Sequence, residues 1–285
     1  MNRLKLNRII DRAFKYVGIG FMSIALLILA VFMINIFIEG FTRIDWEFLT
    51  SLPSRKASRA GIITAWTGTV WILGLTAAIA IPIGIAAGVY LEEYGAKNRL
   101  ASIIEINIAN LAGVPSIIYG LLGLEIFVRL MNMGSSLLAG AMTLSLLILP
   151  IIIVATREAL KAVPKTLREA SYGLGATKWQ TIWYQVLPAA SGGILTGIIL
   201  SLSRAIGETA PLIVIGALAY VPFIPKGPMD EFTVLPMQIF NWISRPQHDF
   251  QVNGAAAIII LLVITFVMNG IAVFLRNKWQ SRINW

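Results

Sequence analysis

The sequence predicts an all-α integral membrane protein with six transmembrane helices. Of its 285 residues, 57% are hydrophobic and only 13% are charged, which is about half the charged fraction of a typical soluble domain. The charges are also absent from several long segments of 19 to 30 residues. A helix of about 20 apolar residues is long enough to cross the hydrocarbon layer of a bilayer.

Each predicted span corresponds to one of these segments. Five contain no charged residue at all: Val17–Ile38, Ile62–Leu91, Ile106–Leu124, Leu130–Thr156 and Phe250–Leu275. One further span, Val186–Pro225, is interrupted only by Arg204 and Glu208. We expect its outer end to be irregular near Pro211, because proline removes a backbone donor from a helix.

The distribution of basic residues predicts the orientation of the spans. With the N-terminus inside, 15 Lys and Arg residues lie in the inner segments and six in the outer loops. Cytoplasmic loops are enriched in these residues, so we expect both termini in the cytoplasm. A seven-span alternative, divided at Pro211, moves the basic C-terminus outside and weakens this asymmetry.

The predicted organisation has two parts. Residues 1–61 form an N-terminal cytoplasmic segment, the first transmembrane helix and an outer loop, and residues 62–285 form the core. The longest inner loop of the core covers residues 157–185.

The composition also limits the kinds of chemistry open to the chain. There is no cysteine and a single histidine, His248, so disulfides and metal sites built from several imidazoles are excluded. The sequence has no G-x-x-x-x-G-K-[ST] phosphate loop. The net charge of +9 is explained by the Lys and Arg residues of the inner segments. We therefore expect contact with the lipid bilayer and none with nucleic acid.

Residues 157–185 contain signals for two short helices, which a simple linker would lack. Pro164 is suited to the start of a helix, Gly173 and Gly175 allow a sharp turn, and Thr177 is suited to cap a second short helix. A helix pair of this kind serves either as a docking surface for another protein or as an interfacial pair on the lipid headgroups.

Part of this loop resembles a known family. Glu169-Ala170-Ser171, Gly175 and Leu187-Pro188 match the spacing of the EAA motif, E-A-A-x3-G-x9-I-x-L-P, of ABC importer permeases, with Ser171 and Gln185 as departures. The resemblance implies a coupling loop that docks on a separate ATPase subunit. That subunit would hold ATP and Mg, and this chain would bind no cofactor. The implied coupling residues are Glu169, Ala170, Gly173, Gly175, Leu187 and Pro188.

The predicted span Val186–Pro225 contains two charged residues, Arg204 and Glu208. They need a partner or water, because an ionised side chain near the bilayer centre costs at least about 2.5 kcal/mol. Arg204 and Glu208 are four residues apart and share one helical face. They form either a structural ion pair or part of an anion path, in which the guanidinium binds a tetrahedral oxyanion. Ser203 and Thr209 add hydroxyl groups nearby.

The segment SRAIGETAPL, residues 203–212, resembles the permeases of phosphate-specific transporters. GVPSIIYGLLGL, LREASYGLGATKWQTI, LPAASGGILTGIIL and YLEEYG extend the resemblance over roughly residues 62–275. It implies a PstA-type permease subunit of an ATP-driven phosphate importer in a prokaryotic inner membrane. The implied partners are a PstC-type permease, a PstB-type ATPase dimer and a PstS-type binding protein outside. Alternatives are the PstC-type subunit or a permease for sulfate, molybdate or phosphonate.

Two readings from other classes stay open at this stage. A membrane-embedded enzyme would need metal ligands or a nucleophile with a base, and a regulatory scaffold would dock partners without transport. Three further charged pairs are interpreted more simply. We expect Glu125 and Arg129 to form a helical ion pair at the outer end of their span, with a contribution to the outer mouth as the alternative. We expect Glu92-Glu93 and Asp230-Glu231 to be solvated or to contact partners. The amphipathic stretch 234–244 lies at the membrane interface or contacts the binding protein.

Overall fold

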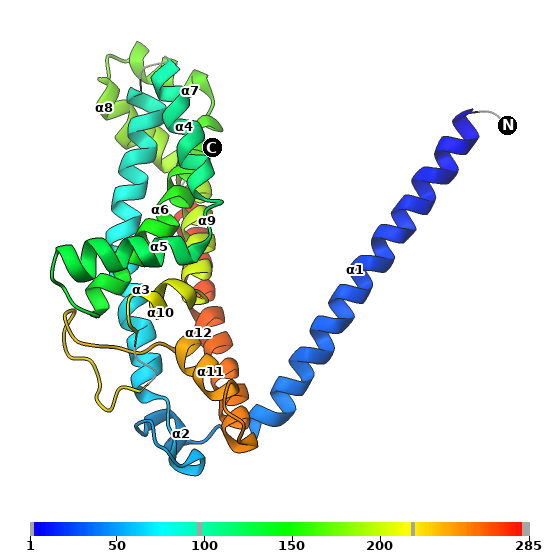
Figure 1. Cartoon of the computed structure of the whole chain (residues 1–285). Helices are drawn as coiled ribbons and strands as arrows, with labels where there is room; N and C mark the ends of the chain where they lie inside the picture. Colours follow the sequence, from blue (N-terminus) through cyan, green and yellow to red (C-terminus); the bar gives the residue numbers. More distant parts are fainter. Residues whose placement is uncertain (1–2, 96–98, 218–219, 281–285) are drawn as a thin grey trace.

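The computed structural model describes residues 3–95, 99–217 and 220–280, and this part of the chain is almost entirely helical (Figure 1). The α-helices are α1 (Arg3–Phe41), α2 (Trp46–Thr50), α3 (Ile63–Val89), α4 (Arg99–Leu111), α5 (Ser116–Gly123), α6 (Leu137–Lys161), α7 (Lys165–Gly173), α8 (Lys178–Thr181), α9 (Leu187–Ile206), α10 (Ala210–Val214), α11 (Leu235–Ile243) and α12 (His248–Gln280). The π-helical turns Tyr90–Tyr94, Leu124–Leu130 and Ile182–Val186 continue α3, α5 and α8, and Ala57–Arg59 is a 3₁₀ turn.

Within the described residues, five helical segments are long and apolar enough to cross a membrane: Ile10–Phe41, Ile63–Tyr94, Leu137–Lys161, Lys178–Ile206 and His248–Lys278. A sixth is a bent pair, Ser102–Leu111 with Ser116–Leu130, whose two halves meet at 99°. The six-helix prediction is therefore confirmed when the bent pair counts as one span. The expectation of an uninterrupted third span over Ile106–Leu124 is wrong, because Pro115 lies in the break and disfavours helical backbone at the residue before it.

The core of the bundle consists of α3, α6 and α9, which approach one another through small residues. Gly84 and Gly88 of α3 lie against Ile152 and Thr156 of α6, and Gly193 and Gly197 of α9 lie against Ala159 and Ala155. A Cβ atom added at any of these glycines would come within 2.7 Å of its neighbour. Such close approach replaces the hydrophobic driving force that is missing between helices in lipid. The pairing also shows that α3 and α6 run parallel and that α9 runs antiparallel to them.

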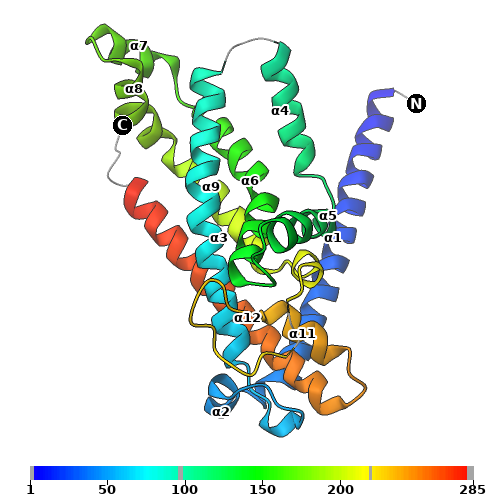
Figure 2. The ribbon, with the colours of Figure 1, turned by 60° about the vertical axis from the view of Figure 1, so that its left-hand side comes forward.

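The first helix is attached to the bundle at one end only. Gly40 lies directly against the backbone of Ala255 in α12, and Ile36 is the buried residue one turn earlier. Towards its N-terminus α1 diverges from the other helices, as both views show (Figures 1 and 2). The division of the chain at residue 62 stays a prediction.

Arg43 holds together the end of the bundle that contains α2 and α11. Its guanidinium donates to Asn253 of α12 and to the carbonyl groups of Ser58 and Ala60, and it lies 5.0 Å from the ring centroid of Phe48. Helix α11 is part of this packing, since Trp242 is fully buried near Phe48. The stretch 234–244 thus buries one face inside the chain, in addition to any contact its exposed face makes.

An ordered loop covers the N-terminal end of α6. Asp230 accepts hydrogen bonds from the backbone N–H groups of Lys226 and Gly227, and these bonds hold the pKa of its carboxyl group below its usual value. The carbonyl groups of Pro228 and Asp230 then accept from the N–H groups of Leu138 and Leu137. The loop therefore satisfies backbone donors in the first turn of α6, which no helical carbonyl reaches. Asp230 is a structural residue of this loop and not merely a solvated charge.

The glycine packing predicts a difference between two substitutions in the same helix. Gly84→Val forces a side chain against Ile152, whereas a Cβ atom at Gly74 has nothing within 4 Å. Both variants carry the same change in helix propensity, so their difference isolates the overpacking, which typically costs about 1–3 kcal/mol. We expect Gly84→Val to lower the thermal unfolding temperature of the purified chain in detergent relative to Gly74→Val. Equal unfolding temperatures would contradict the packing assignment.

The arrangement of the helices also predicts on which side of the membrane Arg55, Leu174 and His248 lie. The start of α1, the end of α12 and the α7–α8 pair lie at one end of the bundle, opposite α2 and α11 (Figure 2). The native chain lacks cysteine, so introduced cysteines are labelled without background. In intact cells an impermeant thiol reagent should label Arg55→Cys and His248→Cys but not Leu174→Cys. Labelling of Leu174→Cys from outside would reverse the orientation.

Candidate functional site

Arg204 lies near the middle of the bundle, in the last turn of α9. Gly197 faces Ala155 of α6, so Arg204, two helical turns further along, lies at about the height of Ile148. Gly84 faces Ile152, so Ile148 lies in turn at the height of Ala80. Because Ala80 is close to the centre of the Ile63–Tyr94 segment, Arg204 is at about mid-depth. The helix ends just after it, at Ile206, and Gly207 is the C-cap.

The side chain of Arg204 is paired but not enclosed. Its Nε lies 3.3 Å from Oε1 of Glu208, and the two side chains are 40% and 17% exposed. No other hydrogen bond holds the guanidinium within the described residues, so most of its N–H groups are free on the surface of this chain. A cation at this depth is not stable against hydrocarbon. The exposed face of Arg204 therefore requires another protein chain or water.

Of the four residues predicted for the path, the structure brings only Arg204 and Glu208 into contact. The hydroxyl of Ser203 lies 2.7 Å from both the carbonyl oxygen of Ile199 and the amide oxygen of Asn269 in α12, so Ser203 is directed towards the α9–α12 contact. Thr209 is half-buried at the start of α10, and its hydroxyl makes no hydrogen bond within the described residues.

Tyr119 is a residue of this region that the sequence analysis missed. It is buried, and its hydroxyl donates to the carbonyl oxygen of Leu111 at 2.8 Å, across the bend between α4 and α5. The same carbonyl accepts from the N–H of Val114 in the turn that ends α4, so the Tyr119 hydroxyl adds a second bond that crosses the bend. The next residue, Gly120, lies against the backbone of Pro211, three residues after Glu208, which places the bend near the ion pair. The signal in the sequence is the Gly113-Val-Pro segment, which marks the break but not its closure by Tyr119.

The predicted helix pair of the inner loop is present, as α7 and α8. Pro164 precedes α7, and Gly175 between the helices has φ +83°, a conformation that residues with a Cβ atom rarely adopt. Thr177 begins α8 in a capping box: its Oγ1 accepts from the N–H of Gln180, and the Gln180 side chain accepts from the N–H of Thr177. We call residues 165–181 the elbow.

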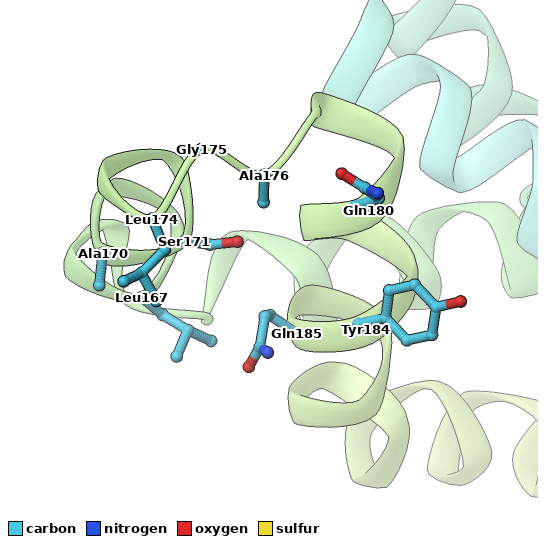
Figure 3. Close-up of a pocket in the computed structure, with 9 residues that line it drawn as sticks. All are labelled: Leu167, Ala170, Ser171, Leu174, Gly175, Ala176, Gln180, Tyr184 and Gln185. Atoms are coloured by element: carbon cyan, nitrogen blue, oxygen red, sulfur yellow. The ribbon is translucent and has the colours of Figure 1, made fainter.

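The elbow and the π-helical turn that follows it form an open groove of about 660 Å³ (Figure 3). A hydrogen bond of 2.9 Å between the hydroxyls of Ser171 and Thr181 joins its two sides. Leu174 at the tip is 90% exposed. The groove is lined by Leu167, Ala170, Ser171, Leu174, Gly175, Ala176, Gln180, Tyr184 and Gln185.

The six predicted coupling residues fall in two places. Ala170 and Gly175 line the groove, and Gly173 is exposed beside it. Glu169 is exposed, and its side chain has no ion pair or hydrogen bond within the described residues. Leu187 and Pro188 lie outside the elbow, in the first turn of α9. The departure Gln185 lines the groove, where a polar side chain is accommodated (Figure 3).

The interpretation of Glu92 and Glu93 as solvated charges or partner contacts is wrong. Glu93 pairs with Arg168 of α7 at 2.8 Å, and the two side chains are 9% and 18% exposed. Glu92 lies 3.5 Å from Arg157 of α6. These partners are 65 or more residues away in the sequence, so no local pattern reveals them. By contrast, the i, i+4 pair Glu125–Arg129 is confirmed at 3.0 Å.

Comparisons with known proteins agree with this arrangement. Residues 80–281 match the family model described as "Binding-protein-dependent transport system inner membrane component". The chain is 31% identical to the probable ABC transporter permease protein YqgI of Bacillus subtilis over 87% of this chain and 90% of the relative. It is 38% identical to the phosphate transport system permease protein PstA 1 of Mycobacterium tuberculosis, over 75% and 70%, and 34% identical to PstA of Haemophilus influenzae, over 87% and 88%.

Solved structures share the fold at low sequence identity. A chain of a bacterial ABC transporter involved in the import of the acidic polysaccharide alginate superposes with a TM-score of 0.69, at 14% identity, over 97% of this chain and 99% of that chain. A chain of the MetNI methionine ABC transporter, in an inward-facing conformation, gives a TM-score of 0.59 at 19% identity, over 76% and 95%. These likenesses confirm the predicted permease fold.

Proposed function

Because the chain belongs to the family of inner-membrane components of binding-protein-dependent transport systems, we propose that it is the PstA-type permease subunit of an ATP-driven importer of inorganic phosphate. Members of this family are multi-pass transport subunits that work with an ATPase and a substrate-binding protein, and they are not themselves enzymes. The names of several relatives support phosphate as the substrate.

The observation that carries the proposal is the half-exposed guanidinium of Arg204 at mid-depth. Its free N–H groups form a planar fork that matches two oxygens of a tetrahedral oxyanion. Glu208 balances the charge when no anion is present, so the empty path is not a strong anion trap. Its carboxylate is also suited to accept a hydrogen bond from hydrogen phosphate, which sulfate lacks the proton to donate. Thr209 contributes a hydroxyl beside the pair, whereas Ser203 acts indirectly, because its hydrogen bond to Asn269 joins α9 to α12.

The partners that we propose follow the faces of the chain. A PstC-type permease completes the path at the exposed face of Arg204, and a PstS-type binding protein delivers phosphate at the end that holds α2 and α11. A PstB-type ATPase dimer, with ATP and Mg, contacts the elbow, where Glu169 and Leu174 are exposed. This chain then binds no cofactor of its own. In a prokaryotic inner membrane both of its termini face the cytoplasm.

The chain also divides into a core and a peripheral part. We propose that residues 62–285 form the permease core, with the coupling loop at 157–185, and that residues 1–61 are peripheral to it. The glycine contacts that join α3, α6 and α9 all lie within the larger part.

The anion-path assignment predicts a loss of transport without a loss of assembly. Arg204→Gln retains most of the side-chain volume but removes the charge and the fork, so phosphate would meet an uncompensated Glu208. We expect uptake by proteoliposomes with the full complex to fall at least about tenfold, since a hydrogen bond to a charged group contributes roughly 1.5–3 kcal/mol. The yield of assembled complex should stay the same. The matched control is Arg129→Gln, which removes the cation of another i, i+4 pair and should leave uptake unchanged.

The Arg204→Gln/Glu208→Gln double variant distinguishes a path from a structural ion pair. Loss of one partner of a structural pair strands the other charge, and loss of both relieves it. In that case the single variants assemble poorly and the double variant recovers both yield and uptake. Recovery of uptake in the double variant would refute the path. We expect the double variant to assemble normally and to transport no phosphate.

The coupling assignment predicts a different failure for the elbow. Gly175→Val places a β-branched residue at φ +83°, which disturbs the turn between α7 and α8. Phosphate uptake and transport-stimulated ATP hydrolysis should both fall while the chain still inserts in the membrane. Gly134→Val is the control, because Gly134 has a similar φ of +63°, open space around it and a position far from the elbow in the sequence. Normal coupled transport by Gly175→Val would exclude the elbow as the ATPase contact.

A further inference from the structure

Six charged side chains lie at the elbow end of the bundle as two neighbouring ion-paired groups, one around Arg157 and one formed by Arg168 and Glu93, and we call them together the inner charge cluster. They come from the π-helical turn that follows α3, from α4, from α6 and from α7. Three are acidic and three are basic, and Glu158 adds a further carboxylate beside Lys161. The members of the cluster are Glu92, Glu93, Glu105, Arg157, Lys161 and Arg168.

One side of the inner charge cluster holds the elbow. Arg168 of α7 donates to the carbonyl oxygens of Val163 at 2.8 Å and Leu160 at 2.9 Å, both just before α7 in the chain. It also donates to Glu93 at 2.8 Å, in the π-helical turn after α3. The elbow is therefore joined to the ends of α3 and α6 by three charge-assisted hydrogen bonds, which are stronger than neutral ones.

The other side of the cluster holds α4. Among the residues of α4 whose side chains are described, only Glu105 and Ile108 are half-buried, and the others are exposed. Glu105 accepts a hydrogen bond from the buried Arg157 and lies 3.6 Å from Nζ of Lys161. No other described side chain of α4 makes a polar contact with another helix. This half of the bent span therefore depends on Glu105 for its position against α6.

Helix α4 leads through the bend to the candidate site. The hydroxyl of Tyr119 holds the bend at Leu111. Beyond it, α5 packs on α10, where Gly120 lies against the backbone of Pro211. Pro211 is three residues from Glu208. A displacement of α4 is thus transmitted to the segment that follows the Arg204–Glu208 pair.

We propose that Glu105 is a positioning residue for transport, through which the elbow sets the position of the α4–α5 bend beside Arg204. Arg157 makes the connection, because the same guanidinium contacts Glu105 on α4 and Glu92 after α3. Movement of the elbow carries the ends of α3 and α6 with it, and Glu105 makes α4 follow. Without Glu105 only an apolar contact retains α4, and it need not move with the elbow. The proposal rests on the transport function stated above.

The matched pair of variants is Glu105→Gln and Glu158→Gln. Glu158 also pairs with Lys161, at 2.9 Å, but it lies on α6 itself and does not touch α4. Each variant is assembled into the full complex in proteoliposomes, and ATP hydrolysis and phosphate uptake are measured together. We expect Glu105→Gln to hydrolyse ATP at the normal rate and to lower uptake per ATP about fivefold, the lower end of typical coupling factors. Glu158→Gln should leave both unchanged.

A distance measurement tests the movement without reference to the substrate. Spin labels at Ile104→Cys on α4 and Lys165→Cys on α7 report whether the two helices keep one separation as nucleotide binds. We expect a narrow distribution in the otherwise unaltered complex and a broad one with Glu105→Gln.

Three results would overturn the proposal: unchanged uptake per ATP, an equal loss with Glu158→Gln, or a loss of assembled complex that accounts for the lost uptake. If the unaltered complex hydrolyses ATP and imports no phosphate, the substrate assignment fails instead, and the label distances still decide the role of Glu105.

Discussion

The close packing of α3, α6 and α9 is the constraint on which the rest of the structure depends. In lipid, apolar surface alone does not drive helices together, so contact requires small residues that let backbones approach. Gly84 and Gly88 provide this for α3, and Gly193 and Gly197 provide it for α9. The resulting register decides the depth of everything attached to these helices. It places Arg204 near mid-depth and brings the ends of α3 and α6 together beneath the elbow.

A second constraint is that backbone groups at membrane depth need partners. The bend between α4 and α5 breaks a helix in this region, and Tyr119 bonds one of the carbonyls that the break exposes. The close contact of Gly120 with Pro211 then packs this irregular segment on another one, the short helix α10. Two interrupted spans therefore meet beside the Arg204–Glu208 pair. Irregular backbone of this kind is tolerated where it is buried in protein or lines a water-filled cavity, and this agrees with a path at that place.

The charges of the chain fall into two classes with different physical roles. The inner charge cluster is extensively paired, and the buried Arg157 and the half-buried Arg168 each contact more than one helix or turn. Loss of one member strands its partner, so the cluster holds helices in place. Arg204 instead has one acidic partner and a large exposed face. A cation that is left partly unsatisfied at mid-depth favours an anion or a partner chain as the missing ligand, and the PstA relatives make phosphate the natural candidate.

The sequence by itself determined the features whose causes are local. Long apolar segments predicted six spans, and Pro164, Gly175 and Thr177 predicted the elbow. The four-residue spacing of Arg204 and Glu208 predicted their pairing. Only the tertiary structure decided the rest, because it depends on residues far apart in the chain. The 99° bend between α4 and α5 is supported by Tyr119 and α10. Ser203 bonds to Asn269, 66 residues later in the sequence, and Glu93 pairs with Arg168, 75 residues later. Local spacing specifies which neighbours on one helix meet, whereas the packing of separate helices specifies which distant charges become partners.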